Sequence, residues 1–179
     1  MTDEYATIPV EMKEVAAYFG KEYLRDVEKE EVMLNLRDIR ETISNDRALL
    51  RAIHFYNDNR RVCQEVSALK NNDFELFKKL VRQSGRSSYM YLQNVFATSM
   101  LKNQSVSLTL ALCEELLGEK GAYRVHGGGF AGTVQAFVPL KMLDEFKNSI
   151  ESVLGEGKCL VLSIRPVGGY ELGYKEAGQ

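Results

Sequence analysis

Apolar side chains recur at helical spacing through the first two thirds of the chain. The longest stripe predicts a helix over about residues 47–70, capped by Asn45 and its neighbours. Similar patterns predict helices over about residues 9–20, 28–43, 74–85, 86–100 and 104–117. Pro9 suits the first turn of a helix, so residues 1–8 are expected to be extended. A short alternation over residues 24–27 also favours an extended segment.

The pattern changes after Leu117. Twelve of the fourteen glycines follow this residue, and apolar and polar positions begin to alternate. The elements predicted here are strands over residues 123–126, 133–138, 159–164 and 170–174, and an amphipathic helix from Pro139 to Gly155. This order predicts an α+β fold, in which helices pack on one face of a mainly antiparallel, ferredoxin-like sheet. Because 179 residues fit one domain, we expect the helical part (1–117) and the glycine-loop part (118–179) to belong to the same domain.

A glycine-rich loop joins the first two predicted strands, with the sequence Gly127-Gly128-Gly129-Phe130-Ala131-Gly132. Three consecutive glycines allow positive φ angles and a close approach of another chain or a ligand. The spacing of Gly127, Gly129 and Gly132 matches a dinucleotide-binding fingerprint. That fingerprint needs a helix directly after the loop, whereas alternation predicts a strand here, so we reject it. Two interpretations remain: a glycine-rich turn within one sheet, or a backbone wall at a phosphate site.

Composition and charge narrow the classes of partner. The net charge of −2 and the pI of about 5.8 lack the basic footprint of a protein that binds nucleic acid or an anionic membrane. No apolar run approaches the roughly 20 residues that a membrane span needs. The N-terminus has no signal-peptide pattern, and the three widely spaced cysteines form no metal-ligand or redox motif. A cytoplasmic protein with idle thiols is therefore expected.

Catalytic motifs are absent from the sequence. It shows no nucleophile elbow, no Walker phosphate loop and no zinc signature, so we expect neither a catalytic nor a metal-ligating residue. His54 lies on the longest predicted helix without a partner at ligand spacing, which favours a packed or surface histidine over a catalytic one. Complete phosphoryl transfer would need magnesium-binding carboxylates and further cationic groups that this chain does not offer.

Residues 124–132 resemble the third conserved motif of the galactokinases, a branch of the GHMP sugar and metabolite kinases. The resemblance covers residues 3–138, and residues 161–169 are similar to a bacterial subgroup of the same family. Segments in the family's order are Asp3-Glu4-Tyr5, Arg51-Ala52-Ile53-His54, Arg60-Arg61-Val62, Asp73-Phe74 and Ser84-Gly85-Arg86-Ser87. An ordered series over most of the chain is more specific than one glycine loop.

The resemblance implies that the chain corresponds to the C-terminal half of a galactokinase. The family's first motif, its serine-rich nucleotide loop and its catalytic aspartate and arginine belong to the other half. The intact enzyme would use ATP and magnesium to phosphorylate the anomeric hydroxyl of galactose, with this half as one wall of the cleft. We therefore expect the chain to be inactive alone, to bind neither ATP nor magnesium alone, and to have the N-terminal kinase half as its partner.

The resemblance carries over to two sites. Tyr5 matches the family's tyrosine that approaches the sugar. The loop that matches the family's loop near the nucleotide phosphates and the sugar consists of Gly127, Gly128, Gly129, Phe130, Ala131 and Gly132. A side chain at Gly128 or Gly129 would push this loop away from what it supports. Departures from the family pattern leave the sugar open: His126 replaces a common threonine, Gly85 a common histidine, and Ala131 a glycine.

Two other functions stay open. The chain could instead be a non-catalytic module that binds a sugar or a protein partner on the same fold. As a structural fragment, it would leave uncovered the apolar face that should contact the other half, and a homodimer through that face is expected.

Overall fold

The computed structural model describes residues 2–130, 132–164 and 166–167, with the backbone alone at residues 2 and 3. Among these residues are seven α-helices and a two-stranded antiparallel sheet, so the expected α+β class is confirmed. The helices are α1 (Thr2–Tyr18), α2 (Lys29–Leu34), α3 (Leu36–Ile43), α4 (Asp46–Lys70), α5 (Phe74–Ser87), α6 (Ser105–Leu117) and α7 (Leu143–Leu154). The strands are β1 (Ala122–His126) and β2 (Thr133–Phe137), paired from Ala122 opposite Phe137 to His126 opposite Thr133.

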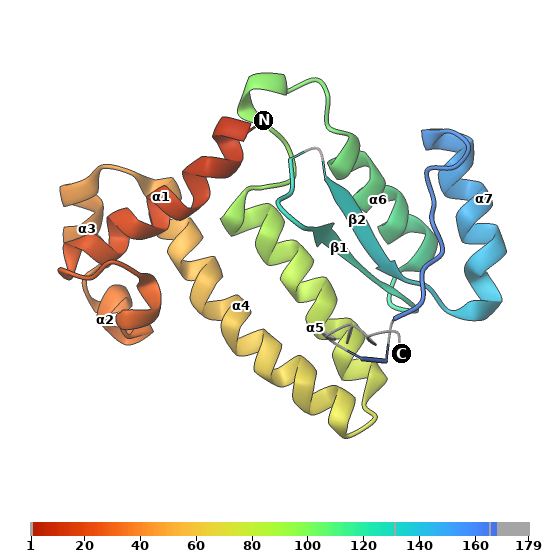
Figure 1. Cartoon of the computed structure of the whole chain (residues 1–179), viewed down its shortest axis with the longest axis horizontal. Coiled ribbons are helices and arrows are strands. Elements are labelled where there is room, and N and C mark those ends of the chain that lie inside the picture. The colour runs from red at the N-terminus through yellow and green to blue at the C-terminus, as the bar shows by residue number, and fades with distance from the viewer. Residues whose placement is uncertain (1, 131, 165, 168–179) are drawn as a thin grey trace, which may run out of the picture.

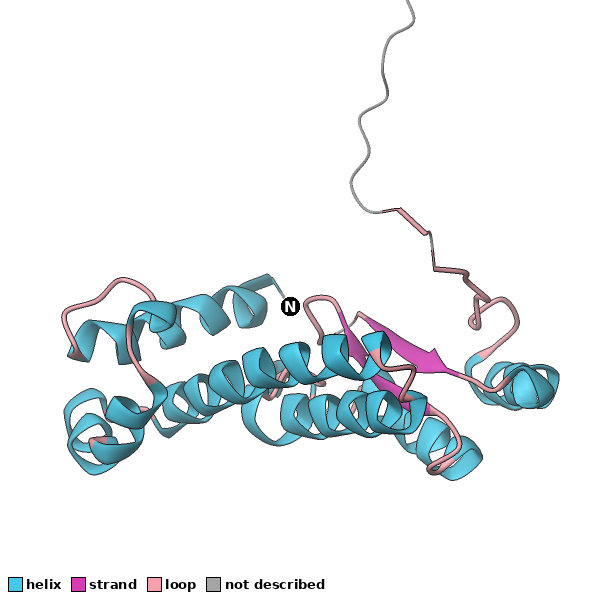
Figure 2. Cartoon of the chain, turned by 90° about the horizontal axis from the view of Figure 1, so that it is seen from below, coloured by secondary structure: helices cyan, strands magenta, loops and turns pink. Residues whose placement is uncertain are grey.

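The helices α4 and α5 form an antiparallel pair through the middle of the molecule (Figure 1). The helices α1, α2 and α3 gather at the N-terminal end of α4, and the strands, α6 and α7 lie beyond α5 (Figure 1). Figure 2, turned by 90°, shows both strands on one side of the helical layer. The hairpin contacts both α5 and α6.

Local sequence explains where several helices begin and end. The Asn45 side chain accepts a hydrogen bond from the Ala48 backbone N–H at 3.2 Å, which caps α4 as predicted. Asp73 caps α5 in the same way, accepting from the Leu76 N–H at 3.0 Å. Gly155 ends α7 with a φ of 101°, which a side chain would disfavour.

The first turn of the chain differs from the sequence prediction. Residues 2–8 were expected to be extended, but they belong to α1, which includes Pro9 in its interior. The Thr7 hydroxyl donates to the Glu4 carbonyl at 2.7 Å, and the Glu4 carboxylate accepts a hydrogen bond from the Thr98 N–H at 2.9 Å. These contacts favour the helix although Pro9 cannot donate to the carbonyl one turn before it.

Two further expectations for the first 43 residues were wrong. Residues 24–26 form a 3-10 turn, not an extended segment. The single helix expected over residues 28–43 is divided into α2 and α3 at Asn35. The Asn35 side-chain amide donates to the Glu31 carbonyl at 2.8 Å, and this local bond competes with the helical ladder.

The prediction of a helix over residues 86–100 was also wrong. Instead, α5 runs past Gly85 to Ser87 and continues as a π-helical turn, Ser88–Leu92, which ends at Gln93 with a φ of 56°. A single 3-10 turn, Thr98–Met100, follows. Gly85 serves packing rather than helix termination, because a Cβ there would lie 2.9 Å from the Tyr123 carbonyl oxygen of β1.

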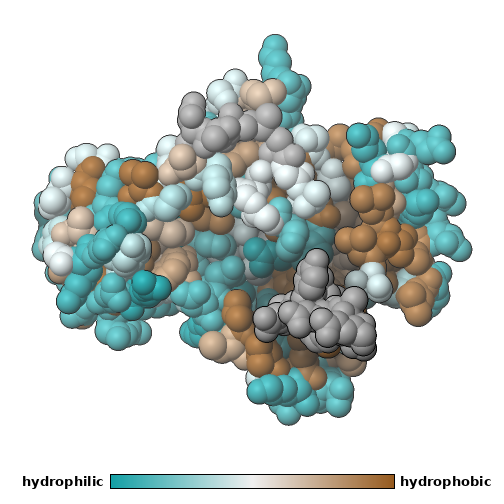
Figure 3. Space-filling model, viewed as in Figure 1, coloured by the Kyte–Doolittle hydropathy of each residue, from teal (hydrophilic) through white to brown (hydrophobic). Residues whose placement is uncertain are grey.

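The third predicted strand is not formed. Residues 159–164 have no strand partner among the described residues, and Leu160, Leu162 and Ile164 are exposed. The edge strand expected over residues 170–174 lies outside the described residues. The brown surface at the right of Figure 3, over α7 and the segment that follows it, shows this apolar exposure. The assignment of both halves of the chain to one domain stays a prediction.

Three clusters of buried apolar side chains form the interior. One joins α1, α2 and α3 to the first half of α4, and a second lies between α6, α7 and the hairpin. The third cluster consists of Val95, Val106 and Val125. It fastens the end of β1 to α6 and to the segment after the π-helical turn, so it fixes the base of the glycine-rich loop. No described helix is both long enough and apolar enough to cross a membrane.

Candidate functional site

The loop Gly127–Gly132 closes the β1–β2 hairpin, as predicted. Gly127 has a φ of 71° and Gly129 a φ of 81°, conformations that favour glycine. The Gly132 N–H donates to the Gly129 carbonyl at 3.0 Å, which tightens the turn. Ala131, which the resemblance also places in the site, lies outside the described residues. For the rest of the loop, the glycines are explained by backbone conformation and by close contacts on both sides.

Asn94 supports the loop from below. Its carbonyl oxygen accepts a hydrogen bond from the Phe130 N–H at 2.5 Å. A Cβ at Gly129 would lie 2.1 Å from the same oxygen, so only glycine fits there. Phe130 is buried and takes a left-handed φ of 60° to make this contact. Asn94 is a supporting residue that the sequence patterns did not indicate, because no spacing rule links it to the loop.

Tyr5 lies against the other side of the loop. A Cβ at Gly128 would come within 2.8 Å of the Tyr5 Cε2 atom, so the ring occupies the space that a side chain would need. The Tyr5 side chain is 55% exposed, which leaves the rest of the ring open to a ligand. The structure therefore brings together the two sites that the resemblance indicates, from distant parts of the chain.

Glu4, next to Tyr5, anchors the start of α1. Its carboxylate accepts hydrogen bonds from both the backbone N–H and the hydroxyl of Thr98. The Arg47 guanidinium lies 3.9 Å from the same Glu4 carboxylate. The Thr98 hydroxyl is the main reason why the pKa of Glu4 lies below its usual range. These contacts hold α1 beside the segment that leads from Asn94 to α6.

A buried arginine, Arg51, extends the polar contacts of α1 into the core. The Arg51 side chain has no exposed surface, and it donates to Glu11 at 2.7 Å and to Thr7 at 2.9 Å. Its Nε atom donates to the Leu92 carbonyl at 3.1 Å, just before Asn94. Arg47 forms a second pair with Glu11 at 2.6 Å. Arg51 thus links α1, α4 and the loop-supporting segment through charged hydrogen bonds.

His54 belongs to a separate polar cluster between α4, α5 and β1. Its Nδ1 lies 2.9 Å from the Ser87 hydroxyl, and its Nε2 lies 3.7 Å from the Asp58 carboxylate. The same carboxylate pairs with Arg61 at 2.6 Å and with Arg124 at 4.0 Å. Burial lowers the pKa of His54, with the positive charges of Arg61 and Arg124 adding to the effect. The histidine is a packed residue within an ion-pair cluster, as the sequence analysis favoured.

The site offers an aromatic ring and loop backbone. Among the described residues, no group of three or more His, Cys, Asp or Glu side chains could hold a metal ion. What the arrangement can do is form part of a binding wall, with Tyr5 supplying an amphipathic ring and a hydroxyl.

Comparison with known proteins finds relatives named galactokinase. No family model matches the chain. Its sequence is 31% identical over 150 residues to Galactokinase of Haemophilus influenzae, a match that covers 84% of this chain and 37% of that protein. Galactokinases of Glaesserella parasuis and Mannheimia succiniciproducens are 28% and 27% identical over the same shares. The chain is thus homologous to the galactokinases, and the relationship expected from the sequence is confirmed. It spans slightly more than a third of the length of these relatives.

Proposed function

We propose that this chain forms one wall of the active-site cleft of a galactokinase-like sugar kinase. In this proposal the whole enzyme converts ATP and galactose to galactose 1-phosphate and ADP in the cytoplasm, with magnesium. The catalytic side chains come from an N-terminal kinase half. The observation that carries the proposal is the contact between the Tyr5 ring and Gly128, because it makes the sugar-facing residue and the phosphate-side loop one continuous surface.

Each part of this wall has a distinct role in the proposal. Tyr5 presents its exposed ring edge and hydroxyl to the sugar. The loop presents backbone to the nucleotide-phosphate side, where side chains would hinder close approach. Asn94 fixes the loop, and the ion pairs of Glu4 and Glu11 fix the start of α1. Such a surface positions reactants rather than exchanging protons or phosphoryl groups.

The test is turnover of ATP and galactose, measured with a coupled assay on the whole 179-residue chain. The chain is assayed alone and with the separately expressed N-terminal part of Haemophilus influenzae galactokinase. We expect turnover only in the mixture. Turnover by the chain alone would contradict the expectation that it is inactive by itself.

Two variants separate the proposed role of Tyr5 from unspecific damage. Tyr5→Ala should lower turnover in the mixture by at least tenfold, which corresponds to about 1.4 kcal/mol of transition-state stabilisation. Tyr23→Ala is the control, since Tyr23 is also part-exposed but contacts Lys13 and Arg25 instead. Equal losses in both variants would argue against a sugar-facing role for Tyr5.

The alternative is a non-catalytic module that binds a sugar or a protein partner on the same fold. Calorimetric titration of the folded chain with galactose distinguishes this function. Micromolar binding by the chain alone, without turnover in the mixture, would favour the module. A flat titration together with turnover in the mixture would favour the kinase wall.

A further inference from the structure

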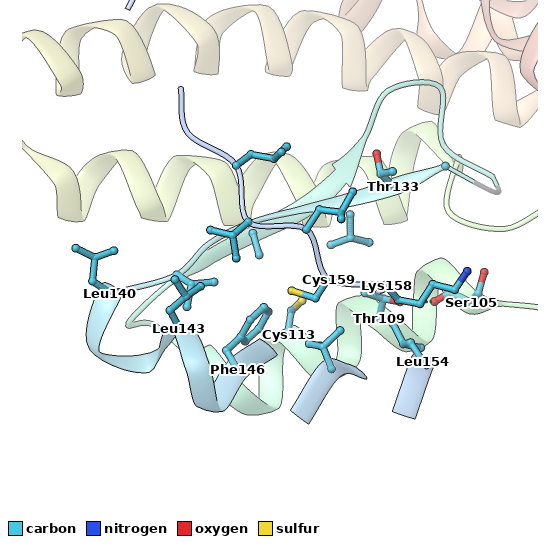
Figure 4. Close-up of a pocket in the computed structure, with 18 residues that line it drawn as sticks. Ser105, Thr109, Cys113, Thr133, Leu140, Leu143, Phe146, Leu154, Lys158 and Cys159 are labelled. Atoms are coloured by element: carbon cyan, nitrogen blue, oxygen red, sulfur yellow. Dashed lines mark hydrogen bonds between the residues drawn. The ribbon is translucent and has the colours of Figure 1, made fainter. Parts of the chain in front are cut away.

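A cavity of about 590 Å³ lies between α6, β2, α7 and the segment after α7 (Figure 4). Its walls are mostly apolar, and Phe146 and Leu143 of α7 form part of them. At its far end it reaches Gly132 and Thr133, where the glycine-rich loop enters β2. Residues 158–162 form the wall that is not part of a helix or strand. The cavity is therefore bounded on one side by a segment without a fixed hydrogen-bonding partner in the sheet.

Two of the three cysteines line this cavity. Cys113 projects from α6 and is 1% exposed, and Cys159 belongs to the segment after α7 and packs against the cluster that contains Cys113. Figure 4 shows the two side chains side by side, with their sulfur atoms directed toward one another. Cys63 is exposed on α4 and does not line the cavity. No sequence pattern indicates this pairing, because the two cysteines lie far apart along the chain.

We propose that Cys113 and Cys159 form a redox-modification site, which a low-molecular-weight disulfide such as oxidised glutathione converts to an intramolecular disulfide. The Cys159 thiolate attacks one sulfur of the glutathione disulfide and releases one glutathione thiolate. The Cys113 thiolate then attacks the Cys159 sulfur of the mixed disulfide and releases the second glutathione. The chain loses two protons and two electrons, and one oxidised glutathione becomes two reduced ones.

The order of attack follows from burial. Cys159 is only partly buried and lies in the wall of an open cavity, so a small disulfide can reach it first. Cys113 is enclosed, and burial raises the pKa of its thiol to about 12. Burial also raises the pKa of Cys159. Because the thiolate is the nucleophile, the reaction should be slow at neutral pH and close to tenfold faster for each added pH unit.

The disulfide would tie the segment after α7 to α6 across the cavity. That segment carries the exposed apolar side chains Leu160, Leu162 and Ile164. Its position sets one wall of the cavity whose far end is the loop at Gly132. Oxidation would therefore fix a segment that the sheet leaves unpaired, next to one end of the candidate site. This inference does not depend on the proposed kinase function.

The experiment uses the full chain with Cys63→Ser, which removes the exposed thiol and with it crosslinks through Cys63. The protein is incubated with oxidised glutathione at pH 8.5 and digested under non-reducing conditions, and the peptides are identified by mass. We expect a Cys113–Cys159 peptide pair, the loss of both free thiols and a rise in melting temperature that dithiothreitol reverses. Adding Cys159→Ser should abolish all three effects.

A third variant, with Cys113→Ala in the Cys63→Ser background, keeps the inference testable if oxidation stops at one cysteine. We expect it to hold glutathione permanently on Cys159, because no second thiol can resolve the mixed disulfide. Two results would overturn the inference. One is a stable glutathione adduct on Cys159 in the Cys63→Ser protein, with Cys113 still free. The other is two unreacted thiols after prolonged incubation at pH 8.5.

Discussion

The Tyr5 ring fills the space beside Gly128 that any larger residue would need, with 2.8 Å between the Cε2 atom and the place of a Cβ. One residue belongs to the first helix and the other to the hairpin loop. Each therefore constrains the other: the ring forbids a side chain in the loop, and the loop provides a flat surface for the ring.

Gly128→Val should displace the Tyr5 ring without unfolding the chain. The ring is half exposed and can rotate outward, so the free energy of unfolding should change by less than about 1 kcal/mol. Turnover in the complemented assay should fall at least tenfold, because the ring that we propose to face the sugar is misplaced. Urea unfolding and the coupled assay measure the two effects. A stable variant with unchanged turnover would remove the loop–ring contact from the function.

Gly129 and Gly127 form a matched pair for testing the loop's support. Gly129→Ala places a Cβ 2.1 Å from the Asn94 carbonyl oxygen at a φ of 81°, so we expect a loss of about 2–4 kcal/mol in unfolding free energy. Gly127→Ala has a similar φ but open space around the Cβ, and it should cost about 1 kcal/mol. Denaturant titration of both variants measures the difference. Equal losses would show that Asn94 does not restrict the loop.

Breaking the buried ion pair between Arg51 and Glu11 should lower the free energy of unfolding. Arg51→Ala leaves the Glu11 carboxylate with only Arg47, in a buried setting, and should destabilise the fold by about 3–5 kcal/mol. Arg37→Ala is the control, because its pair with Glu41 is exposed and should contribute about 0.5 kcal/mol or less. Thermal and urea unfolding provide the readout. A loss below about 1 kcal/mol for Arg51→Ala would mean that water reaches this pair.

Stability should depend on pH through His54. Its pKa is lowered in the folded chain, so the unfolded chain binds the proton more readily. The contribution is fully present above the ordinary histidine pKa of about 6.5 and is lost as the pH falls below it toward the folded-state value. Asp58 opposes this shift, whereas Arg61 and Arg124 favour it.

The measurement is the free energy of unfolding at pH 7.5 and at pH 5.5. The decrease should be smaller in His54→Asn than in the parent chain. His126→Asn changes the other, exposed histidine and should keep the parent's pH dependence. The assignment to His54 fails if His54→Asn loses as much stability on acidification as the parent does.

Sequence patterns located most elements where local chemistry decides the structure. The caps at Asn45 and Asp73, the end of α7 at Gly155 and the hairpin all follow from short-range rules. The errors fall where distant contacts decide. Residues 2–8 are helical beside Thr98, and residues 93–97 leave the helical path where Asn94 supports the loop. Neither partner can be inferred from spacing along the chain.

The candidate site shows the same division. The glycine loop was visible as a motif, and its family resemblance also indicated Tyr5. The contact between them, the support from Asn94 and the anchor at Arg51 needed the three-dimensional arrangement. The cysteine pair was hidden for the same reason, since only the packing of the segment after α7 brings the two thiols together.

The bond between Glu4 and Thr98 joins residues 94 positions apart, and it has a consequence for the order of folding. The α4–α5 hairpin closes a short loop and can form early, whereas the hydrogen bonds of Glu4 at the start of α1 must wait until residue 98 is in place. Tyr5 packs against Gly128, which lies further along the chain than Thr98, so Tyr5 should be among the last residues to reach its native neighbours.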